Sequence, residues 1–212
     1  MLDGRAVRRH LLAAVVAVSG MGLAIEVWVA RAPDDALADA LLPKLSLSYE
    51  ANLPTWFSSS LLLACAVAAA AIAHARPPRA GHWWFISGLA AYISLDEAAE
   101  LHEHLGGHLD TSGLLYFDWV IPAAAIVTGL VLAFLPFVRA LHPATRTRLV
   151  VAGAIYVGGA LVMELPLGWW TEQYGSDSLG YALIDWVEET LEMIGAVLAL
   201  SALIAHRQET AR

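Results

Sequence analysis

Hydrophobic residues along this chain fall into long runs rather than into short alternating segments. Six runs of about 20 residues are separated by short polar stretches that contain proline or glycine. An α-helix of about 20 residues is long enough to cross a hydrocarbon core of about 30 Å. The pattern therefore predicts an all-α, polytopic membrane protein, with residues 1–212 forming a single bundle of six transmembrane helices. The predicted spans are residues 11–30, 55–74, 83–105, 116–138, 148–170 and 180–205.

The basic residues support this division into spans. Short cytoplasmic loops carry an excess of lysine and arginine. In alternating order, the segments on the side of the chain ends hold ten arginines, and the opposite segments hold only Arg31 and Lys44. Both termini are therefore expected to be cytoplasmic, and the abundance of alanine and arginine suggests a bacterial cytoplasmic membrane. The ten arginines are Arg5, Arg8, Arg9, Arg76, Arg79, Arg139, Arg146, Arg148, Arg207 and Arg212.

Composition excludes several other classes of protein. Hydrophobic residues make up 58% of the chain and charged residues 15%, which is unlike a soluble domain. The one cysteine, Cys65, excludes a disulfide framework and a zinc site built from cysteines. With a net charge of −8 and 12 basic residues, the chain has no basic stripe for nucleic acid, so the expected partner is the lipid bilayer.

The longest connection, residues 31–54, contains three prolines and three aspartates and faces the outer side in this topology. Leu37, Leu41 and Leu42 lie on one face of a helix if this segment is helical, and such a helix could rest on the bilayer surface. The same segment could instead act as a lid, and the sequence leaves both interpretations open.

Acidic residues gather in the outer halves of the predicted spans, while the inner halves hold almost none. One charged side chain at the bilayer centre costs about 2.5–3.5 kcal/mol, so such residues are expected to face the bundle interior or a watery cavity. The eleven residues are Glu26, Asp96, Glu97, Glu100, Glu103, Asp118, Glu164, Asp185, Glu188, Glu189 and Glu192.

Two of the spans carry most of these residues in a stripe. At about 100° per residue, the polar residues of span 83–105 cover an arc of about 120°, and those of span 180–205 an arc of about 100°. Both stripes have the spacing Asp-x3-Glu-x2-Glu, which begins at Asp96 in one span and at Asp185 in the other. If these antiparallel helices pack face to face, Asp96 approaches Glu192, and Glu100 approaches Glu189. The alternative is that the matching spacing of the two acidic helices is a coincidence and does not reflect their packing.

Packed carboxylates repel each other, so protons, a metal ion or a cationic ligand must balance them. Asp, Glu and His side chains on facing helices are how bundles hold iron or manganese, and Glu100 and His104 are one helical turn apart. We expect a divalent metal ion, with iron, manganese or zinc favoured and calcium also suitable, and neither haem nor nucleotide. The predicted ligands are Glu100, His104, Glu189, Glu192, Asp96 and Asp185; the supporting residues are Glu97, Glu103, Glu164, Glu188, Glu26, Asp118 and His102.

Glu164 has a second reason to be assigned to this site. Pro166 cannot donate a hydrogen bond to the carbonyl oxygen of Val162, so the helix is expected to kink at this point. Irregular backbone inside a membrane is tolerated where it lines a cavity.

Several functions fit this pattern. The first is a metal-dependent membrane enzyme that acts on a lipid-soluble substrate. Alternatives are a proton- or cation-coupled transporter or channel, a structural network of shared protons, and a non-catalytic membrane subunit. The chain lacks the Glu-x-x-His pairs of the usual di-iron bundle and the His-Glu-x-x-His of zincin hydrolases, so the sequence supports neither of these two kinds of metal site.

Overall fold

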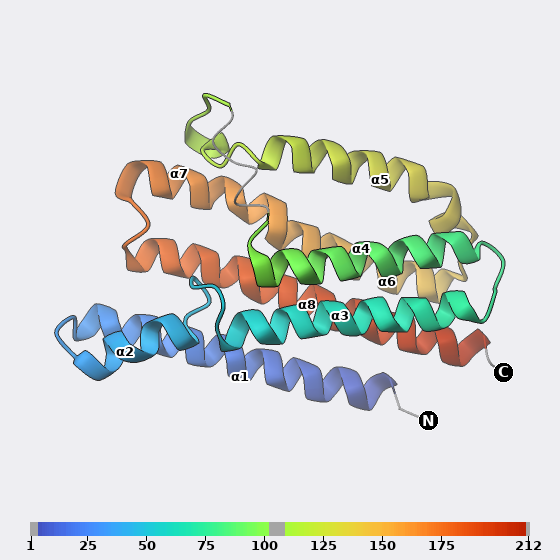
Figure 1. Ribbon diagram of the computed structural model, residues 1–212, viewed down its shortest axis with the longest axis horizontal. Coiled ribbons are helices and arrows are strands. Elements are labelled where there is room, and N and C mark those ends of the chain that lie inside the picture. Colours follow the sequence, from blue (N-terminus) through green and yellow to red (C-terminus); the bar gives the residue numbers. More distant parts are fainter. Residues whose placement is uncertain (1–3, 102–108, 211–212) are drawn as a thin grey trace.

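The computed structural model describes residues 4–101 and 109–210 and, within them, contains helices and no strand. The helices form an elongated bundle with both chain ends at the same end (Figure 1). The prediction of an all-α protein is confirmed. The α-helices are α1 (Gly4–Arg31), α2 (Ala36–Leu45), α3 (Leu53–His74), α4 (Ala80–Ala99), α5 (Val120–Ala140), α6 (Pro143–Val157), α7 (Glu164–Tyr174) and α8 (Leu179–Thr210); a 3-10 helix, η2 (Gly113–Leu115), and a π-helix, η3 (Gly158–Met163), complete the set.

Each of the six predicted spans overlaps a long helical segment in the described part of the chain, because α6, η3 and α7 follow one another without a break. Four segments in the described part of the chain are long and apolar enough to cross a membrane: Ala6–Arg31, Leu53–His74, Val120–Ala140 and Pro143–Tyr174. The structure is thus that of a multi-pass membrane bundle. Six spans are not confirmed, since α4 and α8, which carry six of the eleven acidic residues named above, are not among these four.

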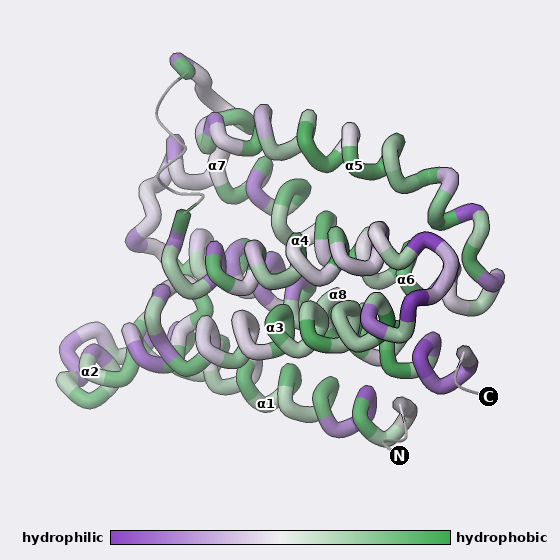
Figure 2. Tube along the Cα trace, turned by 45° about the vertical axis from the view of Figure 1, so that its right-hand side comes forward, coloured by the Kyte–Doolittle hydropathy of each residue, from purple (hydrophilic) through white to green (hydrophobic). Residues whose placement is uncertain are grey.

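Exposed apolar side chains support the assignment to a membrane. On α5, Ile126, Val131 and Leu132 are 63%, 59% and 64% exposed. Apolar residues follow most of the length of α5, and hydrophilic residues gather at the ends of the bundle (Figure 2). Soluble proteins rarely expose apolar surfaces of this extent, whereas a lipid-facing helix requires them.

Helix α8 forms the centre of the bundle. It packs against α1, α3, α6 and η3, while α4 packs along α3. Buried Met193 and Val197 of α8 join Val15 of α1 and Leu61 of α3 in one apolar core. Among the described residues, α4 is not one of the main neighbours of α8, so the face-to-face packing considered for their two stripes is not what the structure has.

Helix α4 is shorter than the predicted span 83–105, of which residues 102–105 lie outside the described part of the chain. Helix α4 ends at Ala99, and Glu100 follows in the left-handed conformation with φ of 53°. Asp96, Glu97 and Glu100 all lie at this C-terminus, where negative side chains oppose the helix macrodipole. Glu100 therefore ends the helix instead of continuing its polar stripe.

The segment 31–54 contains the helix that its leucines suggested. Asp35 caps α2, because its side chain accepts hydrogen bonds from the backbone N–H groups of Leu37 and Ala38, at 2.9 and 3.2 Å. Ala38 is buried and Leu37 is exposed, so α2 has an inner and an outer face. The chain then turns back at the end of the bundle opposite the chain ends before α3 begins (Figure 1).

Candidate functional site: a buried carboxyl cluster

Helix α8 brings four carboxyl groups to one side of the bundle over two turns. Glu188 and Glu192 are buried, and Asp185 and Glu189 are half-buried. Their spacing of three and four residues places them on one helical face, as the sequence pattern predicted. One oxygen of Asp185 and one of Glu188 are buried without a hydrogen-bond partner in the described part of the chain.

Two other helices add a carboxyl group each to this face of α8. Glu97 of α4 lies close enough to Glu189 and Glu192 for their charges to interact. Glu164, at the start of α7, lies similarly close to Glu188 and Glu192, and its side chain is buried. We call the resulting group the carboxyl cluster; it consists of Glu97, Glu164, Asp185, Glu188, Glu189 and Glu192.

The segment between α2 and α3 covers the end of the carboxyl cluster that is farther from the chain ends. The Ser46 hydroxyl donates a hydrogen bond to the Glu26 carboxylate of α1, and Glu26 also interacts electrostatically with Asp185. Ser48 lies beside Asp185, and Glu50 is close to Glu189. These contacts give residues 46–52 the position of a cover over the site.

Asn52 holds this cover in place. Its side-chain nitrogen donates hydrogen bonds to the backbone oxygens of Ser46 and Tyr49, at 2.8 and 2.6 Å. Its side-chain oxygen also accepts a hydrogen bond from the N–H group of Thr55, which caps the start of α3. The turn is therefore fixed to the helix that follows it.

The floor of the carboxyl cluster is built by very close packing of α6 and η3 on α8. A Cβ atom at Gly159 would lie 2.8 Å from the Glu188 backbone oxygen and 2.9 Å from Cγ of Glu192. At Gly195, a Cβ atom would lie 2.7 Å from the Tyr156 nitrogen. This approach lets the Tyr156 side chain form a hydrogen bond with Glu192.

The backbone irregularity expected near Pro166 is present. It takes the form of the π-helix η3, which ends at Met163 directly before Glu164. A π-helical segment changes the direction of the side chains that follow it, and such segments are frequent at functional sites. Here the residue that follows is a member of the carboxyl cluster.

The structure brings together some of the predicted site residues but not all of them. Asp185, Glu189 and Glu192 of the predicted ligands meet in the carboxyl cluster, with Glu97, Glu164 and Glu188 of the supporting residues and Glu26 beside them.

Two predicted site residues have other positions, and Asp96 adjoins Glu97 at the end of α4. Glu100 lies beyond the end of α4. Asp118 accepts a hydrogen bond from the Leu109 backbone nitrogen at 2.6 Å, which gives it a role in holding the loop before α5.

The predicted metal site is not supported by the described residues. Within residues 4–101 and 109–210, no group of three or more His, Cys, Asp or Glu side chains is arranged to hold a metal ion. Three of the predicted site residues, His102, Glu103 and His104, lie outside the described residues. The expected one-turn spacing of Glu100 and His104 also loses its basis, because α4 ends before Glu100.

Sequence reasoning missed four residues around the carboxyl cluster: Ser46, Ser48, Glu50 and Tyr156. The first three lie in a loop, whose path no helical periodicity predicts. Tyr156 could have been noticed as a hydroxyl group in the middle of the apolar run 148–170. Buried tyrosine hydroxyls usually have a hydrogen-bond partner.

Comparison with protein families gives one match over nearly the whole chain. The family model described as "Domain of unknown function (DUF8692)" matches residues 10–207. The chain belongs to this family. The DUF8692 match runs from α1 to α8 and contains every member of the carboxyl cluster. No curated protein and no solved structure matches the chain.

Proposed function

We propose that this DUF8692 protein is a membrane transporter in which the carboxyl cluster binds and releases protons while cations are moved. The observation that carries this proposal is the convergence of carboxyl groups from α4, α7 and α8 on one site in the bundle. Ionisable groups inside a membrane bundle are expensive to place, and chains of Asp and Glu are typical of proton relays.

The chemistry of the site favours protons as the bound species. Neighbouring carboxyl groups in a medium of low dielectric share protons, because two adjacent negative charges repel strongly. The hydrogen bond between Tyr156 and Glu192 adds a hydroxyl group that can orient a proton on the carboxyl oxygen. A proton relay of this kind requires no nucleophilic side chain, and its carboxyl groups need not be arranged to coordinate a metal ion.

Access to the carboxyl cluster is unequal at its two ends. Toward residues 46–52, Glu97, Asp185 and Glu189 are only half-buried, which suits exchange of protons with that side. Toward the chain ends, α8 continues with buried Met193 and Val197, which suits a closed barrier. Transport in this proposal requires a second arrangement that opens the barrier.

The orientation in this proposal follows the arginine distribution. The ten arginines belong to segments that the alternating topology puts on the side of the chain ends, and this side would face the cytoplasm of a bacterial cell. Labelling of intact cells with an impermeant thiol reagent, in a Cys65→Ala background, tests this. Asp177→Cys is expected to react with the reagent, and Gln208→Cys is not. The opposite labelling pattern would show that the protein has the opposite orientation in the membrane.

The proposed function is tested by reconstituting the full chain into liposomes and following internal pH after a cation gradient is imposed. The wild-type protein is expected to move protons, and Glu192→Gln is expected to reduce the rate to that of protein-free vesicles. Asp177→Asn is the matched control, because Asp177 is an exposed acidic residue outside the carboxyl cluster. Equal rates for wild type and Glu192→Gln would contradict the proposal.

A further inference from the structure

A second feature lies at the opposite end of the bundle, where the chain termini are. A cleft of about 650 Å³ opens there, with residues of α1 and α6 on its sides and residues of α8 between them. Arg8 lines it from α1, Arg148 and Val151 from α6, and Leu198 and Ala205 from α8. None of these residues belongs to the carboxyl cluster.

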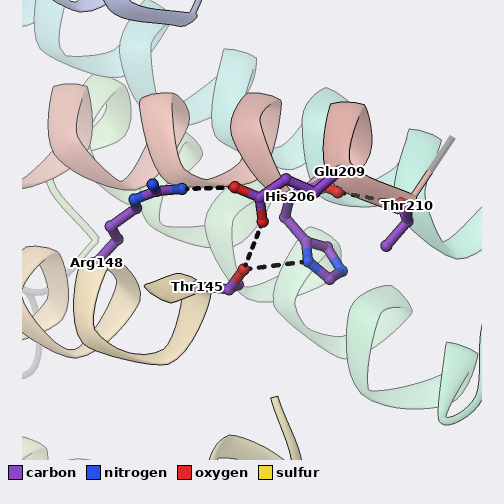
Figure 3. Close-up of polar contacts among 5 residues, drawn as sticks. All are labelled: Thr145, Arg148, His206, Glu209 and Thr210. Atoms are coloured by element: carbon purple, nitrogen blue, oxygen red, sulfur yellow. Dashed lines mark hydrogen bonds and ion pairs between the residues drawn. The ribbon is translucent and has the colours of Figure 1, made fainter. Parts of the chain in front are cut away.

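The polar part of the cleft is organised around one ion pair (Figure 3). Arg148 Nη1 lies 3.0 Å from Glu209 Oε1, and both side chains are about half exposed. The Thr145 hydroxyl lies 3.5 Å from the other Glu209 oxygen and 3.4 Å from His206 Nδ1. These contacts fix Glu209, and Glu209 in turn holds the Arg148 guanidinium beside the cleft.

The charge of the cleft favours an anion. Arg8 is exposed and also lines it, so two guanidinium groups face one carboxylate. A guanidinium has five N–H donors, and the pair with Glu209 leaves Arg148 with donors for a second acceptor. Arginine suits phosphate groups because its donors match two phosphate oxygens at once.

The apolar part of the cleft indicates that the bound anion also has a hydrocarbon group. Val151 is 47% exposed, and Leu198 and Ala205 line the same cleft. Val151 follows Arg148 by one turn on α6, on the side away from the end of the bundle. A phosphate group at the arginines would therefore have an apolar surface next to it, toward the interior of the membrane.

We propose that this cleft binds one anionic glycerophospholipid, with its phosphate at Arg8 and Arg148 and an acyl chain along Val151 and Leu198. A phospholipid has this order of groups, with a phosphate at the membrane boundary and a hydrocarbon chain below it. Free phosphate would leave the apolar surface unused. The proposal does not depend on the function of the carboxyl cluster.

The test is native mass spectrometry of the full chain in detergent, titrated with phosphatidylglycerol or phosphatidylcholine. Wild-type protein is expected to retain one phosphatidylglycerol in preference to phosphatidylcholine. Arg8→Ala and Arg148→Ala are each expected to weaken this binding about fivefold. Arg9→Ala is the matched control, because Arg9 is an exposed neighbour of Arg8 that does not line the cleft.

A variant that fills the cleft distinguishes lipid binding in the cleft from general electrostatic attraction of lipid to the protein surface. Ala205→Phe changes no charge and is expected to displace the lipid, with melting temperatures checked for every variant. Equal losses in Arg8→Ala and Arg9→Ala would overturn the proposal, as would unchanged binding in Ala205→Phe. Competition by inorganic phosphate alone at equal concentration would also overturn it, because the apolar contacts would then contribute nothing.

Discussion

Replacing Gly195 by valine is expected to destabilise the protein by about 3 kcal/mol, because α6 and α8 meet at this residue through backbone atoms. A Cβ atom at Gly195 would lie 2.7 Å from the Tyr156 nitrogen and 2.8 Å from its Cα. Neither atom is the end of a flexible side chain, so the two helices must separate. Small residues allow such close contacts between membrane helices, and larger ones remove them.

The same substitution is expected to disturb the carboxyl cluster. Glu192 is one turn before Gly195 on α8, and its hydrogen bond with Tyr156 depends on the distance between the two helices. Loss of that hydrogen bond would accompany the loss of stability. The tyrosine therefore links helix packing to the chemistry of the site.

The measurement is the melting temperature of the purified protein in detergent. Gly153→Ala is the control, because a Cβ atom at Gly153 meets nothing within 4 Å and alanine favours a helix by up to about 1 kcal/mol over glycine. We expect this control to melt at the wild-type temperature or slightly above it. A Gly195→Val variant that melts with the wild type would show that the helices do not pack this closely.

The double substitution Glu188→Gln and Glu192→Gln is expected to stabilise the protein by about 2 kcal/mol while abolishing proton movement. Both side chains are buried, and each interacts with the charge of Glu164 as well as with the other. Glutamine keeps the shape of glutamate and can still accept a hydrogen bond from Tyr156, but it removes the repulsion between like charges. The gain in stability is expected to be larger in alkaline than in acidic buffer, because the wild-type carboxyls are protonated and neutral in acid.

Thermal melts at several pH values, together with the liposome assay, test this expectation. Asp177→Asn is again the control, since it neutralises an exposed acidic residue and is expected to change neither quantity. A double variant that is less stable than wild type at every pH would show that the two carboxylates stabilise the fold. That result would contradict the expectation that the buried carboxyl groups lower the stability of the protein.

Periodicity predicted those parts of the structure that depend on a single helix. The positions of Asp185, Glu188 and Glu192 on one face follow from 3.6 residues per turn, and the six long helical segments follow from the length of the apolar runs. The missing N–H donor of Pro166 predicted irregular backbone close to Glu164, although as a kink and not as a π-helix.

The errors concern contacts between helices and the ends of helices. Asp96 and Glu97 differ in direction by about 100° on α4, so periodicity alone does not decide which of them faces α8. Hydropathy gives no information on which helices are neighbours, and it did not show that α3 is the main neighbour of α4. The end of α4 before Glu100 depends on the charge at its C-terminus, which hydropathy does not weigh in that way.

The central claim is that the carboxyl cluster holds exchangeable protons inside the bundle. Infrared difference spectroscopy of the full chain in lipid, recorded between acidic and alkaline buffer, measures protonated carboxyl groups directly. We predict a carboxyl carbonyl band that shifts in D₂O, is clearly reduced in the Glu188→Gln and Glu192→Gln double variant, and persists unchanged in Asp177→Asn. A spectrum in which the double variant keeps the wild-type band would contradict the account.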